Sequence, residues 1–223
     1  MIYKNTIKGK FISRPNRFIA MVEIEGAVEV CHVKNTGRCK ELLIPGVTVI
    51  LDISSNENRK TKYDVIAVYK GDKLINIDSS APNKVFYEYL KKDSSITKIK
   101  PEAKYKSSRF DFYIEREDEK IFIETKGVTL EENGIFMFPD APTERGVKHI
   151  NELIDAKNNG YKSLIVFVIQ ADYGKYFTPN RKTHKEFADA LKMAKNQGVK
   201  VLCLNCRVGE NSLEIDREVE VRV

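Results

Sequence analysis

The chain has 223 residues and a formal net charge of +6. Hydrophobic residues make up 42% and charged residues 31%, a balance that excludes an intrinsically disordered chain. No apolar run approaches the ~18 residues of a membrane span, and residues 1–6 lack the apolar core of a signal peptide. We therefore expect a cytoplasmic protein that does not bind membranes.

The positive charge lies mostly in residues 1–80, which hold 13 basic and 9 acidic side chains. This excess is compatible with a polyanionic partner and equally with a solvated surface of mixed charge. The four cysteines should be reduced in the cytoplasm. Cys203 and Cys206 have the spacing of a zinc knuckle, but Cys31 and Cys39 do not complete it, which favours two thiols at the end of a buried strand.

Short strands dominate the first part of the chain, because apolar residues alternate or cluster there between glycine turns. Five strands are predicted, over residues 19–25, 28–33, 47–53, 63–69 and 74–77. Such a series is typical of a small barrel or a curled sheet. Residues 78–83 read as a linker, which predicts one domain over residues 1–80 and a second over residues 81–223.

Helical periodicity appears after residue 83, mixed with further strands. A helix should begin near Asn83, which has a side chain suited to a cap. Later elements are predicted as strands over 109–115 and 120–126, a helix over 143–158, a strand over 163–169, a helix over 182–196 and a strand over 199–204. The second domain is therefore expected to be α/β with a central mixed sheet, and the whole chain α+β.

Two carboxylates mark the predicted hairpin of residues 109–126. Folding it symmetrically about the turn at residues 117–118 places position i opposite position 235 − i, and hence Asp111 opposite Glu124. Phe110, Phe112 and the isoleucines of the second strand should form the opposite, buried face. Two opposed carboxylates repel each other unless a cation lies between them, and Mg²⁺ or Mn²⁺ suits such oxygen ligands.

Lys126 follows Glu124 by two residues and shares its face of the strand. A lysine there can orient the attacking water and stabilise phosphate charge. Asp111, Glu124 and Lys126 are thus the predicted catalytic residues, with Asp111 and Glu124 as metal ligands. The pattern resembles the PD-(D/E)xK nuclease superfamily, although Phe110 stands where that superfamily commonly has proline. Charged residues on a solvated strand face are the alternative explanation.

Two basic clusters are candidate nucleic-acid contacts. The first lies on the polar side of the helix beginning at Thr143, where the helix terminus favours an anion, and consists of Arg145, Lys148 and His149. The second surrounds a predicted tight turn in the first domain and consists of Arg14, Arg17, Lys34, Asn35, Arg38 and Lys40. Tyr3, Phe11 and Phe18 are candidates for base stacking there, or for the core of the barrel.

Four blocks of sequence resemble the sugar fermentation stimulation protein (SfsA) family. They cover residues 32–46, 109–112, 124–130 and 138–149, and the similarity extends over essentially the whole chain. The resemblance implies an N-terminal OB-like barrel followed by a PD-(D/E)xK nuclease-like domain. It also implies binding of DNA with little sequence preference. Single-stranded and branched DNA both remain possible substrates. The protein could be a monomer or a homodimer.

Two functions remain open on these observations. The complete set of Asp111, Glu124 and Lys126 favours a divalent-metal-dependent deoxyribonuclease. The family's association with sugar metabolism favours instead a DNA-binding regulator that keeps a nuclease scaffold without cutting. A module that binds a small molecule or a protein is a more distant alternative.

Overall fold

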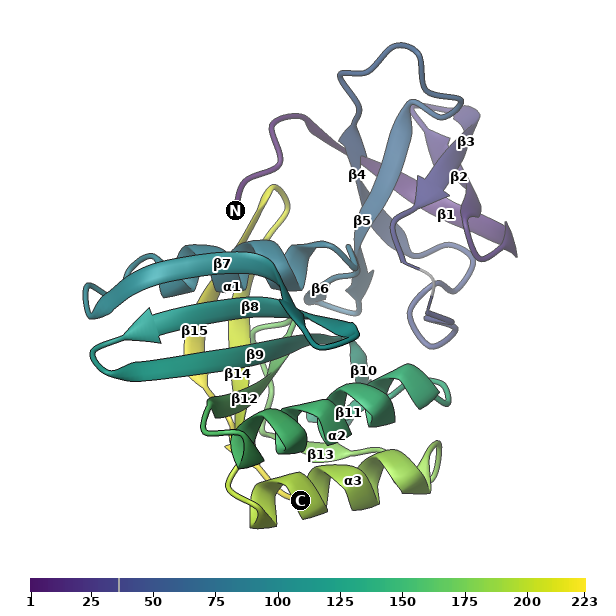
Figure 1. The fold of residues 1–223 in the computed structure, drawn as a ribbon. Helices are drawn as coiled ribbons and strands as arrows, with labels where there is room; N and C mark the ends of the chain where they lie inside the picture. Colours follow the sequence, from purple (N-terminus) through teal and green to yellow (C-terminus); the bar gives the residue numbers. More distant parts are fainter. Residues whose placement is uncertain (36) are drawn as a thin grey trace.

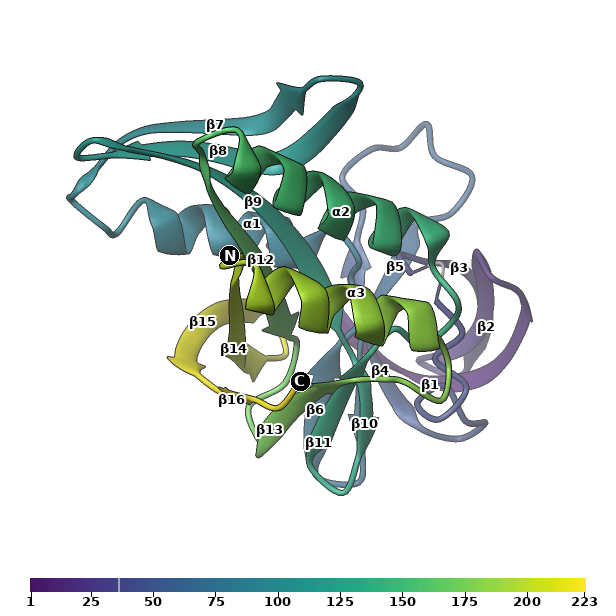
Figure 2. The same ribbon diagram turned by 60° about the horizontal axis from the view of Figure 1, so that its bottom comes forward.

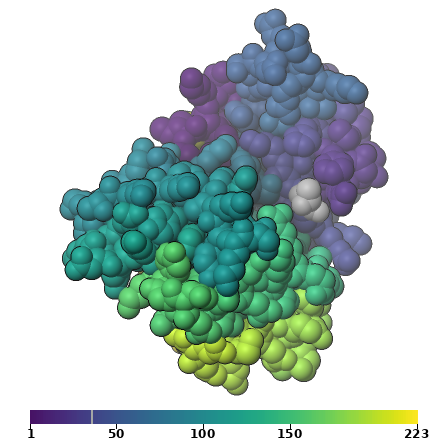
Figure 3. Space-filling view, in the orientation of Figure 1, coloured from purple at the N-terminus to yellow at the C-terminus, as the bar shows by residue number. Residues whose placement is uncertain are grey.

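A computed structural model describes residues 1–35 and 37–223 of the chain. Figure 1 shows two parts: strands from the first 77 residues at one end, and a larger α/β body below them. In the space-filling view of Figure 3, the purple and blue barrel rests against the teal and green part of this body. None of the helices in the described chain is both long and apolar enough to cross a membrane.

The first part is a small, mostly antiparallel sheet that closes on itself through one parallel pairing. Its strands are β1 (Thr6–Asn16), β2 (Ile19–Ile24), β3 (Ala27–Val33), β4 (Thr48–Ile53), β5 (Tyr63–Lys70) and β6 (Lys73–Asn76). They follow the order β3-β2-β1-β4-β5-β6, and a further pairing of β3 with β5 closes a five-stranded barrel. The five predicted strands are confirmed as β2 to β6, whereas β1 was missed.

The second part is built on a six-stranded mixed sheet with the order β15-β14-β12-β9-β8-β7. Its strands are β7 (Ile96–Tyr105), β8 (Ser108–Arg116), β9 (Glu119–Val128), β12 (Lys162–Ile169), β14 (Lys200–Gly209) and β15 (Ser212–Glu218). A smaller sheet contains β10 (Leu130–Glu132), β11 (Ile135–Phe138), β13 (Tyr176–Pro179) and β16 (Glu220–Val221). The expected α/β architecture is confirmed, but the smaller sheet, β7 and β15 were not predicted.

Helices cover both faces of the main sheet (Figure 2). Helix α1 (Ala81–Leu90) packs on one face through Val85 and Phe86, and helices α2 (Glu144–Asn158) and α3 (Lys185–Asn196) lie on the other. Apolar side chains repeat along each helix at helical spacing, so each buries one stripe against the strands. Thr143 caps α2, because its side-chain oxygen accepts a hydrogen bond from the Gly146 amide.

The hairpin of β8 and β9 has the register that the sequence predicts. Phe112 pairs with Ile123 and Arg116 with Glu119, so paired positions add to 235 throughout. Phe112 and Ile123 are buried, as expected, and they pack beneath α1. Phe110 does not: its ring lies 5.3 Å from that of Phe122 on the side of α2. The expectation that Phe110 joins the face of Phe112 is therefore wrong, since Phe110 lies beyond the last pair of the described β8–β9 ladder.

Helix starts also differ from the prediction. Helix α1 begins at Ala81 with Ser80 as its N-cap, so Asn83 lies inside the helix rather than at its cap. The last residues of the expected linker are therefore helical. Helix α3 begins at Lys185, three residues later than expected. The thiols of Cys203 and Cys206 pack in different apolar clusters, as expected of two structural cysteines rather than a zinc knuckle.

The start of the chain lies against the end of the second part. Ile2 forms a β-bridge with Ser212, and the Tyr3 amide donates to the Asn211 carbonyl at 2.8 Å. The Tyr3 hydroxyl lies in a buried polar network at the junction of the two parts, where it donates to Asp78. We call this network the seam; its members are Tyr3, Lys34, Asn76, Asp78, Ser80 and Gln170.

Candidate metal centre

Asp111 lies where β8 separates from β9. The Phe112–Ile123 pair is the last in the described β8–β9 ladder. Just beyond it, the Thr125 amide donates to Asp111 Oδ2 at 2.7 Å, so the side chain replaces a strand partner. Asn83 of α1 donates to Asp111 Oδ1 at 2.9 Å. These two donors fix the carboxylate at the opening between the strands.

Glu124 is the neighbouring carboxylate on β9 and is only 2% exposed. Lys126 Nζ donates to its Oε1 at 2.5 Å, and His149 Nδ1 of α2 hydrogen-bonds the same oxygen. The three predicted catalytic residues are thus close together, and His149 joins them. Of the roles considered for His149, the structure shows a hydrogen bond to a strand carboxylate.

The two carboxylates have opposite pKa shifts. Burial, together with the nearby charge of Glu124, raises the pKa of Asp111 above its ordinary value. Burial also acts to raise the pKa of Glu124, but the hydrogen bond from His149 and the charge of Lys126 outweigh it, so the pKa is lowered. The centre therefore favours one firmly ionised carboxylate beside a second whose charge is not fully compensated.

One oxygen of this centre has no partner in the part of the chain that the structure describes. Glu124 Oε2 is buried, and no donor among residues 1–35 and 37–223 reaches it. A buried carboxylate oxygen without a partner is costly, and a cation would relieve both that cost and the repulsion from Asp111. Asp111 and Glu124 are hard oxygen donors of the kind that Mg²⁺, Mn²⁺ and Ca²⁺ bind. The residues present therefore fit a divalent ion held between these two side chains.

Protein ligands alone would not complete the coordination of such an ion. Within the described chain, no group of three or more His, Cys, Asp or Glu side chains is placed to hold a metal. Mg²⁺ commonly keeps several waters and binds one or two carboxylates together with substrate phosphate. A site with two carboxylates matches that pattern and leaves positions for water and for a phosphate.

Arg145 contacts the other side of the His149 ring. Its Nε lies 3.4 Å from His149 Nε2. The opposite ring nitrogen, Nδ1, faces Glu124 and hydrogen-bonds its carboxylate. The guanidinium of Arg145 remains exposed at the start of α2.

Lys148 has a different neighbour on α2. Its ammonium is 3.7 Å from Glu152, one turn further along the helix, and the side chain is 60% exposed. Arg145 and His149 therefore adjoin the centre, whereas Lys148 lies beside an acidic neighbour. Glu88, another carboxylate on α1, pairs with the amino group of Met1 rather than with this centre.

Several basic residues predicted in the first domain have structural partners. The guanidinium of Arg14 donates to the carbonyls of Arg17, Asn35, Gly37 and Arg38. Lys34 lies 3.0 Å from the fully buried carboxylate of Asp78. Asn35 donates to the Ile77 carbonyl and accepts from the Gly37 amide. The polar groups of these three residues are thus largely used in contacts within the protein.

Other predicted contacts in this domain remain on the surface. Arg17, Arg38 and Lys40 are exposed, and the Arg17 guanidinium lies 4.8 Å from the centre of the exposed Phe18 ring. Tyr3 and Phe11 are buried, so of the three candidate stacking residues only Phe18 is accessible.

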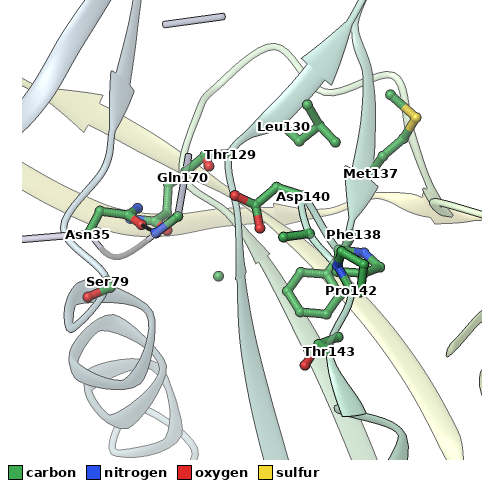
Figure 4. Close-up of a pocket in the computed structure, with 14 residues that line it drawn as sticks. Asn35, Ser79, Thr129, Leu130, Met137, Phe138, Asp140, Pro142, Thr143 and Gln170 are labelled. Atoms are coloured by element: carbon green, nitrogen blue, oxygen red, sulfur yellow. Dashed lines mark hydrogen bonds between the residues drawn. The ribbon is translucent and has the colours of Figure 1, made fainter. Parts of the chain in front are cut away.

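Sequence reasoning missed Asn83 as a member of the centre and missed a cavity beside it. Asn83 was interpreted as a helix cap, and its contact with Asp111 spans 28 residues of chain. The cavity, of about 320 Å³, lies where the loop after β3 meets the segment between β11 and α2 (Figure 4). Its walls come from distant segments of the chain, so local pattern gave no signal for it.

Comparison with known proteins identifies relatives along the whole chain. Residues 12–77 match the family model described as the SfsA N-terminal OB domain, and residues 80–212 match the sugar fermentation stimulation protein RE domain. A sugar fermentation stimulation protein homolog of Ruminiclostridium cellulolyticum is 59% identical over 226 residues, with 100% of both chains covered. One from Clostridium beijerinckii is 58% identical, with 99% of both chains covered.

A solved structure is also similar throughout. It is the structure of Pyrococcus furiosus SfsA in complex with Ca²⁺, with a TM-score of 0.88 and 30% sequence identity. The similarity covers 100% of this chain and 98% of the other. This chain therefore shares its architecture with a protein of known structure. In both, a closed barrel precedes a mixed sheet that has helices on both faces.

Proposed function

The chain belongs to the SfsA family, with an N-terminal OB domain and a restriction-endonuclease-like C-terminal domain, and on that premise we propose that it is a divalent-metal-dependent deoxyribonuclease. In this proposal residues 1–80 bind DNA with little sequence preference, and residues 81–223 hydrolyse the phosphodiester bond. The observation that carries the proposal is the pair Asp111 and Glu124, which has a buried oxygen without a described partner beside a lysine.

Asp111 and Glu124 would hold the metal between their carboxylates. A bound divalent ion supplies Lewis-acid polarisation of the phosphate and lowers the pKa of a coordinated water. The relative from Pyrococcus furiosus was solved with Ca²⁺, which supports a divalent ion at the family's fold. Ca²⁺ shares oxygen ligands with Mg²⁺ and Mn²⁺, which we propose as the ions that support cleavage.

The remaining residues of the centre have distinct proposed roles. Lys126 is placed to align the attacking water and to balance negative charge on the phosphate. His149 and Asn83 touch the carboxylates from α2 and α1, so they are positioning residues that hold the two ligands in register. Arg145 presents an exposed cation at the same helix terminus, where a phosphate is favoured.

DNA contacts outside the centre are proposed for exposed cations. Arg17, Arg38 and Lys40 are accessible on the barrel side. Arg14 already donates to backbone carbonyls, and Lys34 already pairs with the Asp78 carboxylate. Contacts of this kind recognise phosphates rather than bases, so they give binding with little sequence preference. Affinity should accordingly fall as salt rises, because phosphate contacts release counterions.

The direct test is a cleavage and binding assay on the purified protein. Supercoiled and single-stranded DNA are incubated with Mg²⁺, Mn²⁺ or EDTA, and binding is followed by gel shift on the same samples. We expect nicking or degradation with either ion and none in EDTA. Binding without cleavage in either ion would contradict the proposal and identify a non-cleaving DNA-binding protein on a nuclease scaffold.

Removing His149 should weaken the metal centre without removing a ligand. In His149→Ala, Glu124 loses the donor that orients it, and we expect the metal concentration for half-maximal cleavage to rise about 10- to 100-fold. A Mn²⁺ titration of the cleavage rate measures this change. Lys98→Ala is the matched control, because Lys98 also pairs with a carboxylate, Glu115 at 2.9 Å, but lies on β7 outside the metal centre and the cavity beside it. An unchanged Mn²⁺ dependence in His149→Ala would exclude the positioning role.

A further inference from the structure

A cavity lies between the two parts of the molecule and is not used by the proposed chemistry. We call it the seam cavity; it has a volume of about 320 Å³. Asn35 and Ser79 line it from the barrel side, and Phe138, Asp140 and Thr143 line it from the other. Figure 4 shows the Asp140 carboxylate directed across the cavity toward Asn35 and Gln170. A volume of this size can hold one nucleotide.

Three elements of the fold connect the walls of the seam cavity with the metal centre. Its wall includes Gly127, the residue after Lys126, and Thr143, the cap of the helix that carries His149. Ser79 lies shortly before α1, the helix that carries Asn83. The cavity is also at the carboxyl ends of the parallel strands β9 and β12, where ligands commonly bind in α/β sheets.

Hydrogen-bond acceptors face this space. Gln170 is 2% exposed, and its Nε2 donates to Asn76 Oδ1 and to the Asp78 carbonyl. Its Oε1 is beside Gly127, where a Cβ atom would approach it to 2.7 Å, and no donor among residues 1–35 and 37–223 reaches it. Asp140 accepts a hydrogen bond from the Arg38 amide at 3.2 Å. An amide oxygen and a carboxylate suit a ligand that brings N–H donors.

A second hollow, of about 250 Å³, meets the seam cavity at Asn35 and Ser79, which line both. We call it the barrel hollow. Phe18 lines it and is 44% exposed, and His32 lies beside it. An accessible aromatic ring next to basic residues is the usual platform on which an unpaired base stacks. The stacking position and the seam cavity therefore follow one another along the boundary of the two parts.

We infer that this boundary is a track for single-stranded DNA, with one base stacked on Phe18 and the next nucleotides leading through the seam cavity to the metal centre. Duplex DNA could not follow this track, because its bases are stacked and paired. They could enter a cavity only after they become unpaired. A nucleobase has N–H groups that can donate to the oxygens of Gln170 and Asp140. It also has an apolar face that can pack against Phe138. The inference rests on the proposed function and names its substrate class.

Binding in EDTA separates this inference from cleavage. We expect a fluorescein-labelled 15-nucleotide single strand to bind at least tenfold more tightly than a hairpin duplex of the same length, measured by anisotropy. Phe18→Ala should weaken single-strand binding about tenfold, because stacking on an aromatic ring contributes to each bound base. Tyr89→Ala is the matched control, since Tyr89 is 42% exposed but lies on α1 outside both cavities.

A variant that fills the seam cavity tests the second half of the track. Ala141 lines the cavity and is half-buried, so Ala141→Phe should block it and reduce single-strand affinity about tenfold. Its unfolding midpoint in urea, compared with that of the wild type, shows whether the fold is kept. Phe18→Ala, a surface substitution, keeps the test decisive if Ala141→Phe does not fold.

The outcomes distinguish the inference from the proposed function. Tighter binding of the duplex, or unchanged single-strand affinity in Phe18→Ala, would overturn the track, while metal-dependent cleavage of duplex DNA would leave the proposed nuclease intact. Loss of affinity in Phe18→Ala with none in Tyr89→Ala supports the track. If that loss occurs in a protein that cleaves nothing with Mg²⁺ or Mn²⁺, the track stands and the nuclease proposal fails.

Discussion

Asp111→Asn should reduce metal-dependent cleavage about a thousandfold or more while leaving DNA binding nearly unchanged. The substitution keeps the volume of the side chain and can still accept the hydrogen bond from the Thr125 amide. It removes one of two charged ligands, and Lewis-acid catalysis contributes several kcal/mol, with each 1.36 kcal/mol equal to a tenfold change in rate. Initial rates on supercoiled DNA with Mn²⁺ measure the loss, and a gel shift in EDTA measures binding.

Glu124→Gln should have a comparable effect on the rate, and Asp118→Asn should have none. Asp118 is a matched control because it lies exposed at the turn of the same hairpin. Full activity in both Asp111→Asn and Glu124→Gln would show that DNA cleavage does not depend on this metal centre. Loss of binding together with cleavage would show instead that these carboxylates support the fold.

Asp78→Ala should lower the free energy of unfolding by about 3–5 kcal/mol, the range expected when one partner of a buried charge pair is removed. Asp78 is fully buried and accepts hydrogen bonds from Tyr3 and Ser80 as well as the charge of Lys34. Its removal leaves Lys34 without that counter-charge at the seam. Urea unfolding at pH 7, followed by circular dichroism, measures the change in free energy.

The control for this substitution is Asp72→Ala. The Asp72 side chain is 86% exposed, and its oxygen lies 3.6 Å from Lys73. Exposed ion pairs contribute about 0–1 kcal/mol, so this variant should remain close to the wild type. Equal effects of the two substitutions would show that the seam does not hold the two parts of the molecule together.

The contribution of Asp78 should also depend on pH. Burial acts to raise its pKa, but hydrogen bonds from Ser80 and the charge of Lys34 prevail and lower it. A carboxyl whose folded pKa is below its unfolded value stabilises the fold above the unfolded value, about 3.9, and loses that contribution as pH falls toward the folded pKa. The difference between wild type and Asp78→Ala should therefore be constant from pH 7 to pH 5 and shrink below about pH 4.

The sequence predicts the core of the metal centre because that part is local. Asp111 and Glu124 belong to one hairpin, and the polar turn between its strands fixes a register that alternation of buried and charged residues supports. The structure confirms this register. Asn83 and Gln170 come from other elements, and a polar residue on a helix or after a strand gives no sign of a partner far away in the chain.

Strands with few buried residues are the elements that cannot be predicted from the hydrophobic pattern of the sequence. In β1, Gly9 and Phe11 are the buried positions, and in β7 they are Ala103 and Tyr105. Both strands carry at least two lysines and a proline, so their apolar pattern is weak, although β1 pairs with β2 and β4 and the edge strand β7 pairs with β8. The role of a charged residue is equally hard to predict from sequence. Lys34 was a predicted DNA contact, but it pairs with Asp78, 44 residues later in the chain.

The contacts of the first residues with the last hairpin of the main sheet affect how the protein is made. Tyr3 pairs with Asn211, more than 200 residues later, and at about 5–20 residues per second the ribosome needs roughly 10–40 seconds to add the residues between them. During that interval the first residues of the barrel lack the strands against which they rest. We expect nascent chains stalled before residue 211 to be cut by proteases near Tyr3, and released chains that include the last hairpin to resist.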